Sequence, residues 1–144
     1  RLCGYFTAHL ALCAALRPDS RALWAMGLGF VLERGLSGLA IARFPLAKNT
    51  GLAHTFATAA DRTAVGRILM AVCALTAAAM IALGGGAGGV MALAALLVFW
   101  RYRVTADSQF GGLSGDLAGW FLQRAELWML GALVACQLLE ARFL

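Results

Sequence analysis

Five apolar runs separated by short polar stretches make up most of this 144-residue chain, and they limit its fold more than any other feature. About 20 apolar residues are enough for a helix to cross the hydrocarbon core of a bilayer. The second run has this length, whereas the first is short for a crossing. The pattern predicts an all-α, polytopic membrane helical bundle of about five transmembrane helices, forming a single membrane domain over residues 1–144. The runs are residues 2–16, 22–44, 64–83, 90–100 and 116–139.

The composition agrees with a membrane protein. Apolar residues make up 62% of the chain and charged residues 13%, whereas soluble domains are about half apolar and about one quarter charged. The net charge of +5 comes without a basic stripe that carries interleaved aromatic residues, so we expect the lipid bilayer as a partner and no nucleic acid. The four cysteines lie singly in apolar runs, which favours small buried side chains over a metal or disulfide site. The sequence leaves the oligomeric state open.

The connections between the runs differ in character. Residues 45–63 and 104–114 are predicted to be polar loops, whereas the glycine-rich residues 84–89 predict a tight turn, because they lack the Gly-Lys-Ser/Thr ending of a phosphate loop. With five crossings, both polar loops lie on the side of the membrane that has more basic residues, which is expected to be cytoplasmic. The basic residues of that side are Arg1, Arg43, Lys48, Arg62, Arg67, Arg101 and Arg103, against Arg17, Arg21 and Arg142 on the other.

Charged side chains inside the apolar runs need partners. Glu33 and Arg34 lie near the middle of the second run, where a lipid-exposed charge costs about 3 kcal/mol or more. Glu126 lies ~15 Å beyond Asp116 along one straight helix, so these two carboxylates cannot share a metal ion. We expect Arg34 to be the partner of Glu126, and both residues to support the site from within the bundle. In a rival interpretation, the chain is a small membrane transport or scaffold module, and Glu33, Arg34 and Glu126 line a polar path with Arg124.

The stretch Gly-Gly-Leu-Ser-Gly-Asp, residues 111–116, opens the last apolar run. Asp116 is either a carboxylate stabilised at a helix N-terminus by ~0.5 kcal/mol or a functional carboxylate that binds Mg²⁺ together with phosphate oxygens. Glycines let the backbone approach a ligand closely, and exposed amides at a helix start attract phosphate, which favours the second interpretation. Asp116 is therefore the candidate catalytic and metal-binding residue.

A phosphate ligand also needs basic and polar partners on the same face. Lysine supplies a point charge for phosphate, and arginine supplies a planar fork. The alternative for each basic residue is an ordinary anchor at the membrane interface. The candidates for substrate or phosphate binding are Lys48, Asn49, Arg101, Arg103, Gly111, Gly112, Ser114 and Gly115.

Two motifs resemble one known family. Gly-Gly-Leu-Ser-Gly-Asp-Leu-Ala-Gly at residues 111–119, followed by Glu126 in a long apolar helix, resembles the C-terminal signature of cobalamin synthase, the adenosylcobinamide-GDP ribazoletransferase family. Leu-Glu-Arg-Gly at residues 32–35 and Phe-Pro-Leu-Ala-Lys-Asn-Thr-Gly-Leu at residues 44–52 are similar to a second stretch of that family. The resemblance implies a multi-pass enzyme of the bacterial inner membrane. With Mg²⁺, it would join α-ribazole, or its 5′-phosphate, to adenosylcobinamide-GDP and release GMP in the last steps of cobalamin biosynthesis.

The resemblance covers the C-terminal part of this family. The family's N-terminal part carries an acidic Asp-Gly-Leu-Ala-Asp-type segment, and no such segment occurs in this sequence. Gln123 stands where a family glutamate is usual, Trp120 where alanine is usual and Lys48 where arginine is usual. We therefore expect the chain to be part of a longer transferase, or a divergent or inactive relative, rather than a complete enzyme by itself.

Overall fold

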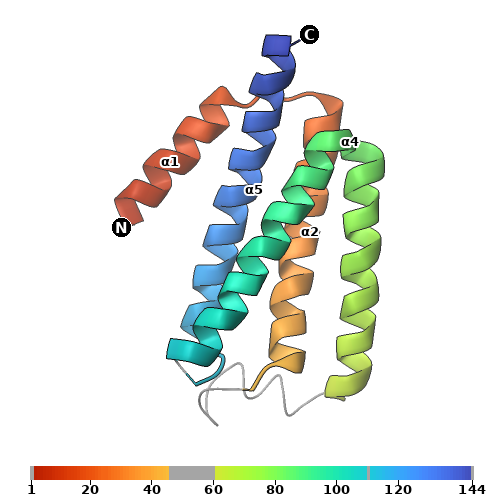
Figure 1. Cartoon of the computed structure of the whole chain (residues 1–144), viewed down its shortest axis with the longest axis vertical. Helices are drawn as coiled ribbons and strands as arrows, with labels where there is room; N and C mark the ends of the chain where they lie inside the picture. Colours follow the sequence, from red (N-terminus) through yellow and green to blue (C-terminus); the bar gives the residue numbers. More distant parts are fainter. Residues whose placement is uncertain (1, 46–60, 110, 144) are drawn as a thin grey trace.

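The computed structural model describes residues 2–45, 61–109 and 111–143, and these residues form four helices. Figure 1 shows α2, α4 and α5 packed together, with α1 on the outside beside α5. The predicted all-α class is confirmed. The helices are α1 (Leu2–Ala15), α2 (Ser20–Arg43), α4 (Arg62–Gln109) and α5 (Gly115–Phe143).

The long helix α4 turns back at Gly85, so it consists of two arms joined at one end of the bundle (Figure 1). Gly85 has φ of 62° and ψ of −144°, a conformation that glycine adopts far more readily than other residues. Gly88 is needed for space, because a Cβ atom at this position would overlap the backbone carbonyl of Met80. The turn predicted from the glycine run is therefore present.

The second arm of α4 continues to Gln109, so the predicted polar loop at 104–114 is wrong over most of its length. Tyr102 and Ala106, one turn apart, are fully buried. Arg103 and Asp107, also one turn apart, are exposed and form an ion pair with 3.9 Å between the charged atoms. The polar residues of this stretch thus occupy the outer face of an amphipathic helix.

Two helices, Ser20–Arg43 and Arg62–Gln109, are long and apolar enough to cross a membrane by length and composition. Helix α1 has 14 residues, fewer than the ~20 that a crossing needs. The third and fourth apolar runs lie on the two arms of α4, on either side of the turn at Gly85. Membrane association is therefore supported, whereas the expected count of about five transmembrane helices is not confirmed.

Apolar side chains that range in size from alanine to tyrosine fill the core between α2, α4 and α5. Ala25, Ala95 and Ala125, one from each helix, are fully buried, which allows close approach of the helices. Gln137 of α5 exchanges two hydrogen bonds with the backbone of Arg17: its carbonyl accepts from N–H at 3.0 Å, and its amide donates to C=O at 2.7 Å. The connection between α1 and α2 is thereby held against the C-terminal half of α5.

Candidate functional site

The two motif stretches meet at the end of the bundle where α2 and the second arm of α4 end and α5 begins, which we call the loop end (Figure 1). The backbone N–H of Leu113 donates to the carbonyl of Pro45 at 2.8 Å, and that of Gly112 donates to the carbonyl of Ala106 at 3.0 Å. Arg62, at the start of α4, donates to three carbonyls at the end of α2 at 3.0 to 3.5 Å. Direct hydrogen bonds therefore join all the helix ends that meet here.

Four aromatic rings pack together next to the loop end, and we call them the aromatic cluster. They are Phe44, which is the C-cap residue of α2, Phe99 and Tyr102 of α4, and Phe121 of α5. The rings of Tyr102 and Phe121 stack with 4.8 Å between their centres. The ring centre of Phe99 lies 5.7 Å from that of Phe44 and 5.7 Å from that of Phe121. Each such pair contributes about 1 kcal/mol beyond the burial of its surface. The cluster fixes the ends of three helices relative to one another, and with them the two motif stretches.

Positive φ angles at Gly111 (62°) and Gly112 (147°) form the turn that leads into α5. Ser114 then accepts a hydrogen bond from the N–H of Leu117 at 3.3 Å and so caps this helix. Asp116 is exposed in the first turn of α5. Both interpretations of Asp116 fit this position, because the helix dipole favours a carboxylate there and solvent exposure leaves it accessible to a ligand.

Arg101 and Arg103 lie on different faces of α4, since two residues along a helix are about 200° apart. The guanidinium of Arg103 lies 5.1 Å from the ring centre of Phe44, at the loop end. Arg101 instead lines a groove between α4 and α5. The structure therefore brings Arg103 close to the motif stretches and places Arg101 on another surface.

Three arginines that sequence reasoning did not select line a pocket of about 550 Å³ at the loop end. The side chain of Arg43 packs over Gly66, where a Cβ atom would come within 2.9 Å of its Nε. The concentration of basic residues around the 45–63 loop is the sequence signal for this pocket. Lys48 and Asn49, also predicted to bind phosphate, lie outside the described residues. We call this cavity the arginine pocket, and its lining residues are Ala42, Arg43, Phe44, Pro45, Arg62, Thr63 and Arg67.

Four polar side chains of α1, α2 and α5 meet around the fully buried Glu33, and we call Tyr5, Glu33, Arg34 and Glu126 the buried polar group after this residue. Glu33 is fully buried and lies 3.6 Å from Nε of Arg34. Arg34 also lies 3.9 Å from a carboxylate oxygen of Glu126, so the predicted pairing of these two residues is confirmed as a contact. The hydroxyl of Tyr5 donates to the other oxygen of Glu126 at 3.0 Å. The guanidinium of Arg34 thus forms ion pairs with two carboxylates, one on α2 and one on α5.

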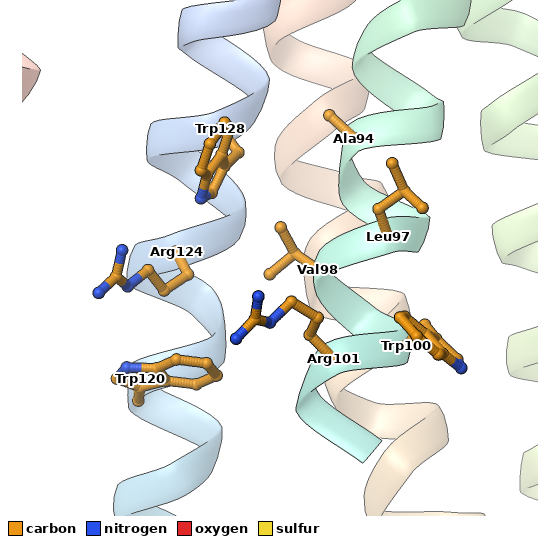
Figure 2. Close-up of a pocket in the computed structure, with 8 residues that line it drawn as sticks. All are labelled: Ala94, Leu97, Val98, Trp100, Arg101, Trp120, Arg124 and Trp128. Atoms are coloured by element: carbon orange, nitrogen blue, oxygen red, sulfur yellow. The ribbon is translucent and has the colours of Figure 1, made fainter. Parts of the chain in front are cut away.

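A groove of about 500 Å³ lies between the second arm of α4 and α5 (Figure 2). The guanidinium of Arg124 lies 5.7 Å from the ring centre of Trp120 within it. Because Arg124 faces this groove while Glu126 contacts Arg34, the residues of the rival transport interpretation do not line one path. We call this cavity the indole groove, and it is lined by Ala94, Leu97, Val98, Trp100, Arg101, Trp120, Arg124 and Trp128.

Asp116 is suited to one ligand position of Mg²⁺ rather than to a complete metal site. Within the described residues, no group of three or more His, Cys, Asp or Glu side chains is placed to hold a metal ion. However, Mg²⁺ is commonly held by one or two carboxylates together with substrate phosphates and water. The exposed carboxylate of Asp116 fits that kind of site, in which the ligand supplies most of the oxygen donors.

The apolar helices and the arginine- and glycine-rich loop end define a helical, membrane-associated protein that gathers its polar motifs at one end. Residues 2–134 match the family described as cobalamin-5-phosphate synthase, and the chain belongs to this family. The chain is 38% identical over 123 residues to the adenosylcobinamide-GDP ribazoletransferase of Lachnoclostridium phytofermentans. The matched part covers 85% of this chain and 46% of that relative, so the chain spans about half the length of the curated relative. No solved structure matches it. The resemblance inferred from the two motifs is thus confirmed.

Proposed function

We propose that this chain forms the diphosphate-holding part of an adenosylcobinamide-GDP ribazoletransferase. The hydrogen bond between Leu113 and Pro45 carries the proposal, because it joins the two family motifs at one end of the bundle. In the transfer, an oxygen of α-ribazole, or of its 5′-phosphate, attacks a phosphorus of the diphosphate, and the bond to the departing GMP breaks. Such reactions are accelerated by alignment of the reacting atoms and by neutralisation of charge. A shared end for both motifs provides the place for that alignment.

The residues of the loop end have separate parts in this proposal. Asp116 would hold Mg²⁺, which supplies neutralisation of the diphosphate charge when bound. The backbone N–H groups at the start of α5 point toward an anion bound at this helix end. Arg103 and the arginine pocket add guanidinium groups, whose fork geometry matches phosphate oxygens. The buried polar group supports the site by linking α2 to α5 without contacting the substrate.

We place the protein in the bacterial inner membrane with the loop end in the cytoplasm. Arg43, Arg62 and Arg103 lie at the loop end. Arg17 and Arg142 lie at the opposite end, where the hydrogen bonds of Gln137 hold the α1–α2 connection against α5. The excess of basic residues at the loop end supports this orientation.

The test is GMP release by the complete gene product in proteoliposomes that contain adenosylcobinamide-GDP, α-ribazole and Mg²⁺. We expect Asp116→Asn to lower the rate by a factor of about 100 to 1,000, because the Mg²⁺ that would neutralise the diphosphate charge loses its carboxylate ligand. The matched control is Asp19→Asn. Asp19 caps α2 at the other end of the bundle, and asparagine caps helices equally well. Normal turnover of Asp116→Asn would remove Asp116 from the site, and absence of GMP release by the wild type would reject the proposed activity.

A further inference from the structure

The indole groove combines cationic and apolar surface in a way that neither the transfer reaction nor the helix packing requires. Its lining includes two arginines and three tryptophans but no acidic residue. Within the described part of the chain, neither Arg101 nor Arg124 takes part in an ion pair. A guanidinium held at the side of an apolar bundle is costly unless an anion or water compensates it. The groove is therefore complementary to an anion that also has an apolar part.

The indole groove opens on the outer surface of the helical bundle, not into its core. Leu97, Trp100 and Trp128 are 55%, 64% and 59% exposed, respectively. Asp116 and the glycine turn are not among the lining residues. A ligand in this groove therefore comes from the medium beside the helices, which is lipid for a membrane-embedded bundle.

Arg101 lies at the loop end of the groove beside Trp120, Arg124 lies midway along the lining of α5, and apolar residues line the other end. On α4, Arg101 lies nearer the loop end than Leu97 and Ala94, which follow one another along the helix in Figure 2. On α5, Arg124 likewise lies nearer the loop end than Trp128. The lining extends over roughly 12 Å of α5. A phospholipid presents the same order, with its phosphate toward the membrane surface and its acyl chains toward the middle.

We propose that the indole groove is a binding site for an anionic phospholipid, with the headgroup phosphate between Arg101 and Arg124 and an acyl chain against Ala94 and Leu97. Basic pockets between helices on the cytoplasmic side are suited to anionic headgroups, and indoles are favoured at this depth of the membrane. The proposal rests on the membrane location and is independent of the transferase activity. A lipid in this position would neutralise both arginines and fill the gap between α4 and α5.

The fluorescence of the three tryptophans in the groove can be used to measure lipid binding. The full chain, carrying Trp24→Phe to remove the indole on α2, is reconstituted in brominated phosphatidylcholine, which quenches the fluorescence of nearby tryptophans. Unbrominated phosphatidylglycerol is then titrated in, and emission recovers as it displaces the quencher. We expect recovery at a lower mole fraction of phosphatidylglycerol than of unbrominated phosphatidylcholine. We expect this preference to fall about fivefold for each guanidinium removed in Arg101→Gln and Arg124→Gln.

Two further variants make the outcome decisive. Arg17→Gln combined with Arg142→Gln removes the same charge at the opposite end of the bundle and is expected to keep the preference. Ala94→Phe fills the groove without changing charge and is expected to lose it, which tests the proposal even if the arginine variants fail to fold by circular dichroism. An unchanged preference in Ala94→Phe, or in a folded variant that combines Arg101→Gln with Arg124→Gln, would overturn the proposal. Displacement of phosphatidylglycerol by millimolar inorganic phosphate would also overturn it, by showing a site for free phosphate.

Discussion

The carboxylate of Glu33 is fully buried, and neither of its oxygens accepts a hydrogen bond within the described part of the chain. Its compensation comes from the guanidinium of Arg34, 3.6 Å away, which also reaches Glu126. The side chain of Arg34 is itself 65% exposed. Electrostatic balance inside this bundle therefore depends on one arginine that is itself only partly enclosed.

We expect Arg34→Gln to lower the free energy of unfolding by about 1–3 kcal/mol, because two neighbouring carboxylates lose their cation. Arg21→Gln, at an exposed position of the same helix, is the control and should change stability little. Unfolding is followed by circular dichroism in detergent with increasing denaturant. Adding Glu126→Gln to Arg34→Gln should recover part of the loss, since it removes one of the stranded carboxylates. A fully additive pair of losses would contradict this account.

Sequence reasoning succeeded for Arg34 and Glu126 because charges in apolar helices must find partners, and few candidates exist. It missed the separation of Arg101 from Arg103, because a loop was predicted from residue 104 onward, whereas α4 continues to Gln109 and places the two residues about 200° apart. It also missed the position of Arg124 in the groove between α4 and α5, since this depends on which face α5 turns toward α4. Contacts of this kind are set by helix rotation, which composition and run length do not determine.

At the scale of elements, the turn inside α4 is the position where one backbone conformation decides the fold. Gly85 has φ of 62°, whereas its neighbour Gly86 does not fall in the positive-φ region and has no atom within 4 Å of a Cβ placed on it. We expect Gly85→Ala to destabilise the protein by about 1–2 kcal/mol, because an L side chain disfavours this conformation. Gly86→Ala should be neutral or slightly stabilising. Thermal unfolding of the two variants in the same detergent makes the comparison, and equal melting temperatures would contradict it.

The elements also show where pattern reading is weakest. The glycine run was a sufficient signal for a turn, because such a run lowers helix stability and supplies the conformation a reversal needs. The polar residues after Trp100 were a poor signal for a loop. Tyr102 and Ala106 are buried one turn apart, whereas Arg103 and Asp107 face outward. A short amphipathic stretch at the end of an apolar helix is thus easily mistaken for a connection.

At the scale of the whole molecule, the proposed topology places Ser108 and Ala141 at opposite membrane surfaces. Both residues are exposed, near the ends of α4 and α5 respectively. In a variant without the four native cysteines, we expect Ala141→Cys to react with a membrane-impermeant maleimide in spheroplasts. Ser108→Cys should react only after permeabilisation, and Asn49→Cys should behave in the same way. Labelling of Ser108 and Asn49 from different sides would reject a common cytoplasmic site.

The overall class of the molecule followed from its apolar runs, and the convergence of the two motifs is seen directly in the bond between Leu113 and Pro45. The number of crossings did not follow, because α1 is short for a crossing. The candidate site is only partly available to the same reasoning. Asp116 lies where a helix start was expected, whereas the arginine pocket forms because the end of α2 and the start of α4, which carry its three arginines, lie side by side.

The reversal in α4 has a consequence for how the chain enters a bilayer. From Ile68 to Trp100, on both arms and through the turn, the chain contains no charged side chain. Transfer of an ionised group through hydrocarbon is the costly part of membrane insertion. In the proposed topology, the two arms can therefore enter together as a preformed hairpin, with no charged side chain crossing to the far leaflet, while the arginines that flank them stay on the side where synthesis takes place.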